Sequence, residues 1–138
     1  MLFSQQSLAS QRCDGKLLDQ VENENMHFQD WASLYRSYTK FKACDQGGGL
    51  SEGYSEAVVR LLADHWVNFY QFGALSTKDK AFKRWVLNHI DATTSGDDLK
   101  AVTRHAGTEC PKGSDRLCKE IRIQVDDAIK EASKYEKK

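Results

Sequence analysis

Four cysteines carry the clearest chemistry in this sequence: Cys13, Cys44, Cys110 and Cys118. Cysteines form disulfide bonds, bind metal ions or act as nucleophiles, and four of them allow three different disulfide pairings. No pair shows the C-x-x-C spacing that is typical of zinc ribbons and of thioredoxin-like redox sites. We therefore expect two structural disulfides and no metal site, in a protein of an oxidising compartment.

The positions of the cysteines favour one pairing. Cys110 and Cys118 flank a predicted turn between two helices, and Cys118 falls one turn into the second helix, so a bond between them would join these helices. Closing so short a loop stabilises the fold by roughly 2–3 kcal/mol in the chain-entropy model. Cys13 would then pair with Cys44, and the alternative is that Cys13 is free.

A catalytic cysteine is one alternative to a binding function. Cys118 lies near Arg116 and Lys119, and neighbouring cations favour the reactive thiolate. A small hydrolase would use one of the four histidines as the base: His27, His65, His89 or His105. No motif links a cysteine to a histidine, and no G-x-S-x-G motif is present, so the sequence does not favour this hydrolase.

Paired carboxylates are the second candidate for catalysis. Glu52 and Glu56 lie four residues apart on one face of a predicted helix, and such pairs serve acid–base chemistry in glycosidases. Acids at the start of a helix are also favoured by the helix dipole, which explains both residues without catalysis. A glycosidase cleft needs more chain than this protein offers. We therefore expect no enzymatic activity and no cofactor.

A run of three glycines, Gly47–Gly49, precedes the same helix. A phosphate-binding loop would continue with Gly-Lys-Ser/Thr, whereas the sequence LSE follows here. One glycine is enough to end a helix, so the additional glycines indicate a flexible loop beside a docking surface. We expect a partner protein to bind there, with tyrosine as an anchor and acids that attract a basic partner, at Asp45, Glu52, Tyr54 and Glu56. The alternative is that Tyr54 packs into the core.

The element that must position these residues is a predicted central helix, Ser51 to Phe72, ended by Gly73. Apolar side chains recur in it at three- and four-residue spacings, the pattern of a helix that faces a core. We expect Val58, Leu62 and Trp66 to be buried against later helices, at Phe82, Val86, Ile121 and Val125.

Five further segments have helical patterns. They are a short helix within Lys16–Met26, a helix from an Asp30 N-cap to Cys44, one from a Ser76 cap to Ile90, one from a Ser95 cap to Gly107, and a last helix after a Ser114 cap. No segment alternates apolar and polar residues as a strand does. The sequence therefore predicts an all-α fold, a compact bundle of five to six helices in a single domain, residues 13–138. Residues 1–12 are expected to form a flexible N-terminal arm, a remnant of a signal peptide.

Composition excludes several classes of partner. The chain has 20 lysines and arginines and 20 aspartates and glutamates, so its net charge is zero and nothing indicates nucleic-acid binding. No apolar run of about 20 residues predicts a membrane span. An aromatic stripe at Trp31, Tyr35 and Tyr38 leaves a carrier of small apolar ligands as a further alternative, although nothing polar lies near it to orient a ligand.

The chain resembles the small, exported, all-helical, disulfide-bearing proteins of Gram-negative bacteria, of which the type VI secretion amidase immunity proteins are an example. The shared features are a tyrosine-rich first helix that ends in a cysteine (Tyr35, Tyr38, Cys44), a long central helix and late cysteines (Cys110, Cys118). The resemblance covers most of the chain as an architecture and carries over no functional residue. It implies a non-enzymatic periplasmic or secreted protein that binds and blocks another protein.

Overall fold

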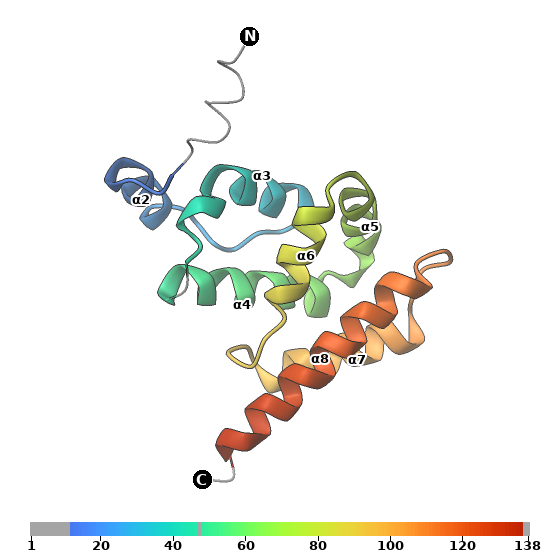
Figure 1. Ribbon diagram of the computed structural model, residues 1–138. Helices are drawn as coiled ribbons and strands as arrows, with labels where there is room; N and C mark the ends of the chain where they lie inside the picture. Colours follow the sequence, from blue (N-terminus) through green and yellow to red (C-terminus); the bar gives the residue numbers. More distant parts are fainter. Residues whose placement is uncertain (1–11, 47, 137–138) are drawn as a thin grey trace.

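The computed structural model describes residues 12–46 and 48–136, and these residues form seven α-helices and two short 3₁₀-helices without any strand (Figure 1). The α-helices are α2 (Gly15–Glu22), α3 (Trp31–Phe41), α4 (Gly48–Asp64), α5 (Phe69–Lys78), α6 (Lys80–Asn88), α7 (Gly96–Thr108) and α8 (Asp115–Glu136). The 3₁₀-helices are η1 (Lys42–Cys44) and η2 (Trp66–Asn68). The all-α prediction is confirmed, but five to six helices was too low a number. The expected flexible arm, residues 1–12, lies outside the described residues except for Arg12.

Three aspartates and a serine start helices as N-caps. The Asp30 carboxylate accepts a hydrogen bond from the Ser33 N–H at 2.8 Å, and Ser95 caps α7, as expected. The predicted cap at Ser76 is wrong, because this serine lies inside α5, and Asp79 caps the next helix instead through the Phe82 N–H. Helix α4 begins at Gly48, so Gly48 and Gly49, which were expected in a flexible loop, lie in the first turn of the helix instead.

The central helix is broken at His65, so the predicted continuous helix from Ser51 to Phe72 is wrong. The break gives the seventh helix. In an unbroken helix the Ala63 carbonyl would accept from the N–H four residues later, but here it accepts from His105 Nε2 of α7 at 2.9 Å. Trp66 stacks on the same imidazole and donates its indole N–H to the Glu109 carbonyl at 2.9 Å. Contacts from α7 therefore replace one turn of helix, and Gly73 falls within α5 rather than ending the helix.

Buried side chains from α3 to α8 form one core cluster. Its centre is aromatic. Trp31 stacks on Phe72 with 4.5 Å between the ring centroids, and the ring centroid of Tyr38 lies about 5 Å from those of Phe82 and Trp85. The predicted core residues are all buried within this cluster, namely Val58, Leu62, Trp66, Phe82, Val86, Ile121 and Val125. Each such side chain contributes about 1.5–3 kcal/mol through removal from water, and together they pack α4 against α7 and α6 against α8.

Helices α7 and α8 form an antiparallel pair that crosses the other helices, with α8 as the long final helix (Figure 1). Their connection contains Gly113, whose φ of 88° lies in the left-handed region that favours glycine. None of the described helices is both long enough and apolar enough to cross a membrane.

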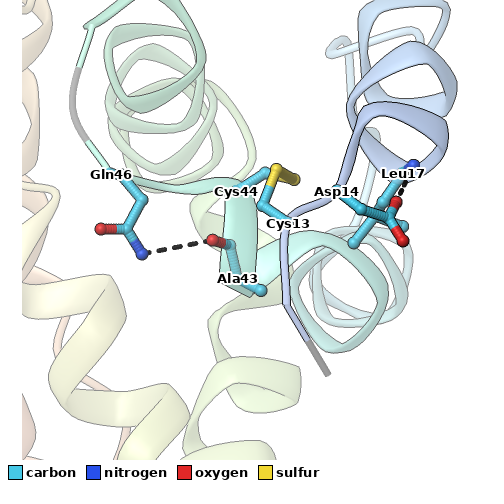
Figure 2. The surroundings of a disulfide bond; sticks show 6 residues. All are labelled: Cys13, Asp14, Leu17, Ala43, Cys44 and Gln46. Carbon is cyan, nitrogen blue, oxygen red and sulfur yellow. Dashed lines mark hydrogen bonds between the residues drawn. A yellow bond between two sulfur atoms is a disulfide. The ribbon is translucent and has the colours of Figure 1, made fainter. Parts of the chain in front are cut away.

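Both predicted disulfides are present. Cys110 and Cys118 join the end of α7 to the first turn of α8, with a Cα–Cα distance of 6.2 Å. Cys13 and Cys44 join the segment before α2 to η1, with a Cα–Cα distance of 4.8 Å. Figure 2 shows the second bond beside Asp14, which caps α2 by accepting from the Leu17 N–H at 2.8 Å. The first disulfide therefore clamps the α7–α8 hairpin, and the second attaches α2 to the rest of the fold.

Candidate functional site

Tyr54, the expected anchor of the docking surface, is fully buried. Its ring packs edge to face against Trp85, with 4.9 Å between the ring centroids, and its hydroxyl oxygen lies 2.7 Å from Ser37 Oγ. Burial raises the pKa of Tyr54 to about 12, which keeps the phenol neutral. Tyr54 therefore packs into the core, and the expected docking surface has no exposed tyrosine.

The acids expected around Tyr54 do not form one surface either. Glu52 and Glu56 are exposed on α4, where Glu56 forms an ion pair with Arg60 one turn later. Asp45 instead turns inward, and its side chain is only 6% exposed. The structure thus separates the four residues into two solvated glutamates and two buried groups.

Asp45 belongs to a buried polar network with Ser55 and His89. His89 Nε2 lies 2.7 Å from Asp45 Oδ2, and His89 Nδ1 lies 2.7 Å from Ser55 Oγ. Two further contacts complete the network: the Trp85 indole N–H donates to Asp45 Oδ2 at 2.6 Å, and the Ser55 hydroxyl donates to Asp91 Oδ2 at 2.6 Å. This network joins the residue that follows η1, helix α4 and the C-terminal end of α6 through side chains alone.

Serine, histidine and aspartate in sequence-distant positions are also the components of a hydrolytic triad, which is recognised by geometry. A nucleophilic serine must meet its substrate, but Ser55 is fully buried and its hydroxyl already donates to Asp91. His89 is nearly as buried. In this conformation the arrangement acts as a structural network that pairs most of its buried polar atoms, although Asp45 Oδ1 has no hydrogen-bond partner among the described residues.

The charge state of Asp45 follows from its contacts. Burial alone would raise the pKa of this carboxyl, but hydrogen bonds from His89 and Trp85 and the nearby imidazole charge outweigh burial, so its pKa lies below the ordinary value. Asp45 follows Cys44 directly, so the Cys13–Cys44 disulfide also fixes the segment that carries this carboxylate.

Sequence reasoning missed this network because its members lie 34 to 44 residues apart. The one local signal is the spacing of Trp85 and His89, which are four residues apart and therefore share a face of α6. Nothing in the sequence indicates that Asp45 meets that face.

The residues considered for cysteine catalysis and for a ligand carrier have structural partners instead. Cys118 is bonded to Cys110 and is not a free thiol. The stripe of Trp31, Tyr35 and Tyr38 contacts further aromatic rings: the ring centroids of Tyr35 and Phe82, for example, lie 4.8 Å apart. Among the described residues, no group of three or more histidines, cysteines or acids is arranged to hold a metal ion.

An open groove of about 790 Å³ lies on the described surface. We call it the α5–α8 groove, because α5 and α6 form one wall while the α7–α8 connection and the first turns of α8 form the other. Its residues are Tyr70, Gly73, Ala74, Ser76, Thr77, Lys80, Lys83, Arg84, Leu87, Pro111, Lys112, Gly113, Ser114, Arg116, Leu117 and Glu120. None of them belongs to the docking surface predicted from the sequence.

The α5–α8 groove is basic. Five of its residues are lysines or arginines, and Glu120 is its one acid. Glu120 is already paired with Lys83 across the groove, at 2.8 Å between Oε1 and Nζ, so four cations face solvent without an acid among the lining residues. Tyr70, one of the lining residues, is 65% exposed, and the walls also include Leu87, Leu117 and Pro111. The groove therefore combines positive charge with exposed apolar surface.

Comparison with protein-family models, with curated proteins and with solved structures gives no match to this chain.

Proposed function

We propose that this protein works in an oxidising compartment, as a periplasmic or secreted protein, and acts by binding another protein in the α5–α8 groove. The observation that carries the proposal is the groove itself, with Tyr70 exposed on its edge. Tyrosine and arginine are enriched among the residues that dominate the energy of protein interfaces, and Tyr70, Arg84 and Arg116 lie together here.

The two disulfides support the proposed location in an oxidising compartment. Disulfides persist where the environment is oxidising, and they are rare where glutathione and thioredoxin keep thiols reduced. All four cysteines of the chain are paired, and each bond ties together elements that shape the fold. An immunity or inhibitor role is the form of protein binding that the resemblance to exported immunity proteins implies, and it belongs to the same proposal.

The interior position of the Ser55–His89–Asp45 network favours binding over hydrolysis. A hydrolase would need Ser55 or Cys118 at a surface that substrate reaches. Ser55 is buried beneath α6, and Cys118 is bonded to Cys110.

The test starts from the protein in its source cells. Thiols are alkylated before lysis, the compartments are separated, and a cross-linker is added to the fraction that contains the protein. We expect the protein in the periplasmic or secreted fraction, unalkylated, with a partner cross-linked at lysines of the groove such as Lys80, Lys83 and Lys112. Recovery from the cytosol with four alkylated thiols would contradict the compartment. Cross-links that map only to α2 and α3 would contradict the docking site.

A further inference from the structure

We infer that the α5–α8 groove binds an acidic segment of the partner protein, with carboxylates seated between α6 and the start of α8. This inference rests on the proposed function, since it names the chemistry of the partner that the groove receives. It is carried by the charge of the groove, by the helix start that forms one wall, and by an unused buried hydroxyl.

The α5–α8 groove has an excess of positive charge. The chain as a whole has as many acids as bases, so a random patch of its surface should be neutral. The groove instead holds five cations against one acid, drawn from α6, the α7–α8 connection and α8. A recess lined by one sign of charge concentrates ligands of the opposite sign and speeds their association.

The N-terminal end of α8 forms part of the groove wall and adds to its positive potential. The first N–H groups of an α-helix have no acceptor within the helix, and the helix dipole makes this end positive. Ser114, Arg116 and Leu117 from this end line the groove, and α8 is 22 residues long. Asp115 is exposed in the same turn without lining the groove, so it competes for this positive end and must be considered in any test.

Ser76 gives the independent observation. It lies on the opposite wall, in α5, and is 6% exposed. Its hydroxyl oxygen is one of four buried side-chain atoms without a hydrogen-bond partner among the described residues. The others are Trp31 Nε1, Asp45 Oδ1 and Glu120 Oε1, and only the last of these also lines the groove, where it is ion-paired with Lys83. A buried hydroxyl without a partner is unfavourable by roughly 1–3 kcal/mol, so native structures rarely leave one unused. A carboxylate in the groove would supply the acceptor that Ser76 lacks.

An acidic peptide fits the groove better than a free anion or a nucleic acid does. A volume of about 790 Å³ is far larger than one phosphate needs, and the walls include Leu87, Leu117 and Pro111 beside the cations. Apolar contacts of this kind suit side chains of a polypeptide. Nucleic-acid binding domains are basic over a whole face or helix, whereas this chain is neutral overall.

The experiment uses the oxidised full chain, labelled with nitrogen-15, and four probes at low salt: octaglutamate, octaglutamine, inorganic phosphate and octathymidylate. We expect octaglutamate to shift the amide signals of residues 112–117 and of α5 and α6, and octaglutamine to shift none. Binding should weaken as salt rises. Equal binding of octaglutamine, no binding of octaglutamate, or shifts outside the groove would overturn the inference. Tighter binding of octathymidylate or phosphate would replace the acidic peptide by those ligands.

Charge variants sharpen the assignment. The double variant Arg84→Glu/Arg116→Glu should weaken octaglutamate binding about tenfold or more, since two attractive contacts become repulsive. The matched control Arg104→Glu/Lys130→Glu changes two exposed cations outside the groove and should leave the affinity within about twofold.

Two further variants should act in the opposite direction. Glu120→Gln frees Lys83 and should tighten octaglutamate binding, and Asp115→Asn removes the competing acid at the start of α8 and should do the same. Loss of fold alone cannot produce tighter binding. If either variant weakens binding, the electrostatic basis of the inference is wrong.

The outcomes also separate this inference from the function on which it rests. If octaglutamate fails to bind but a partner still cross-links to the groove, the acidic segment is wrong and the proposed function stands. If octaglutamate binds as described but no partner is found in any fraction, the anion-binding groove stands and the proposed function fails.

Discussion

Asp45 shows how a residue can be recognised as important in the sequence for the wrong reason. Its place beside a glycine run favours an exposed acid, but the structure turns its carboxylate inward to accept hydrogen bonds from Trp85 and His89. A buried charge is tolerated only when such partners compensate for the water it has lost. Asp45 is therefore placed to stabilise the fold, and its carboxylate does not face a partner in this conformation.

Asp45→Ala should lower the free energy of unfolding by about 3–5 kcal/mol, because it leaves His89 and Trp85 without their buried acceptor. Urea unfolding followed by circular dichroism measures this. Asp19→Ala, which removes an exposed acid on α2, is the matched control and should change stability by less than about 0.5 kcal/mol. Equal losses in the two variants would show that the network contributes nothing specific.

Asp45 should also make stability depend on pH in the acid range. Its folded pKa lies below the ordinary value, so its contribution is fully present above the unfolded pKa of about 3.9 and is lost as the pH falls through the folded pKa. The pKa values of Asp30 and Asp79 are lowered in the same direction, by hydrogen bonds from Ser33 and from Phe82 and Tyr35 respectively. Stability measured from pH 6 downward should therefore fall below about pH 4. The decline in stability should be shallower in Asp45→Ala than in the wild type. An identical slope in the two proteins would show that Asp45 does not have a lowered pKa in the folded state.

At the scale of elements, the sequence predicted helices and local caps well, because these depend on residues three or four positions apart. Asp30 and Ser95 are caps where they were expected. The break after Asp64 was not predictable, since the apolar stripe runs on through Trp66 and Phe69 without a proline or glycine. At the break the Ala63 carbonyl accepts a hydrogen bond from His105 of α7, which lies 42 residues away along the chain.

Substitution of His105 by alanine should destabilise the break between α4 and α5. The variant leaves the Ala63 carbonyl and the Glu109 side chain without their partner and removes the stacking on Trp66, so stability should fall by about 1–3 kcal/mol. Hydrogen exchange should quicken at residues 64–68. Arg104→Ala, at the exposed position before it, should change neither quantity. Unchanged exchange in His105→Ala would mean that the break has another cause.

Candidate sites were harder to predict than helices, because their residues come from distant parts of the sequence. The docking residues around Tyr54 were chosen from one short segment, whereas the α5–α8 groove gathers residues from positions 70 to 120. Three of its cations, Lys80, Lys83 and Arg84, lie close together in the sequence, but Lys112 and Arg116 come from a separate segment beside the acid Asp115, so the sequence does not show that the five share one surface. Only the packing of α8 beside α6 collects one sign of charge on one surface.

At the scale of the whole molecule, the pairing of the cysteines was predictable, because one pair flanks a single turn and only one partner then remained for Cys13. The two bonds close loops of different length, with sequence separations of 31 and 8 residues. Longer loops lose more entropy in the unfolded chain when they are closed.

Removal of the Cys13–Cys44 bond in Cys13→Ser/Cys44→Ser should therefore lower the free energy of unfolding by about 3–4 kcal/mol in the chain-entropy model. Cys110→Ser/Cys118→Ser removes the shorter loop and should lose about 2–3 kcal/mol from this source, plus the packing of the buried Cys118. Chemical unfolding under non-reducing conditions measures both variants. A wild-type protein whose intact mass shows four alkylated thiols without reductant would contradict the bonds themselves.

The central claim is that a partner protein docks in the α5–α8 groove, and two tyrosines of matched exposure test it most directly. Tyr70, on the groove, is 65% exposed, and Tyr135, near the end of α8, is 66% exposed. Isothermal titration with the cross-linked partner, once purified, gives the dissociation constant of each variant. Tyr70→Ala should weaken binding by about tenfold or more with the melting temperature nearly unchanged, while Tyr135→Ala should bind as wild type does. If Tyr70→Ala binds as tightly as wild type, or Tyr135→Ala loses as much affinity, the partner does not dock in this groove.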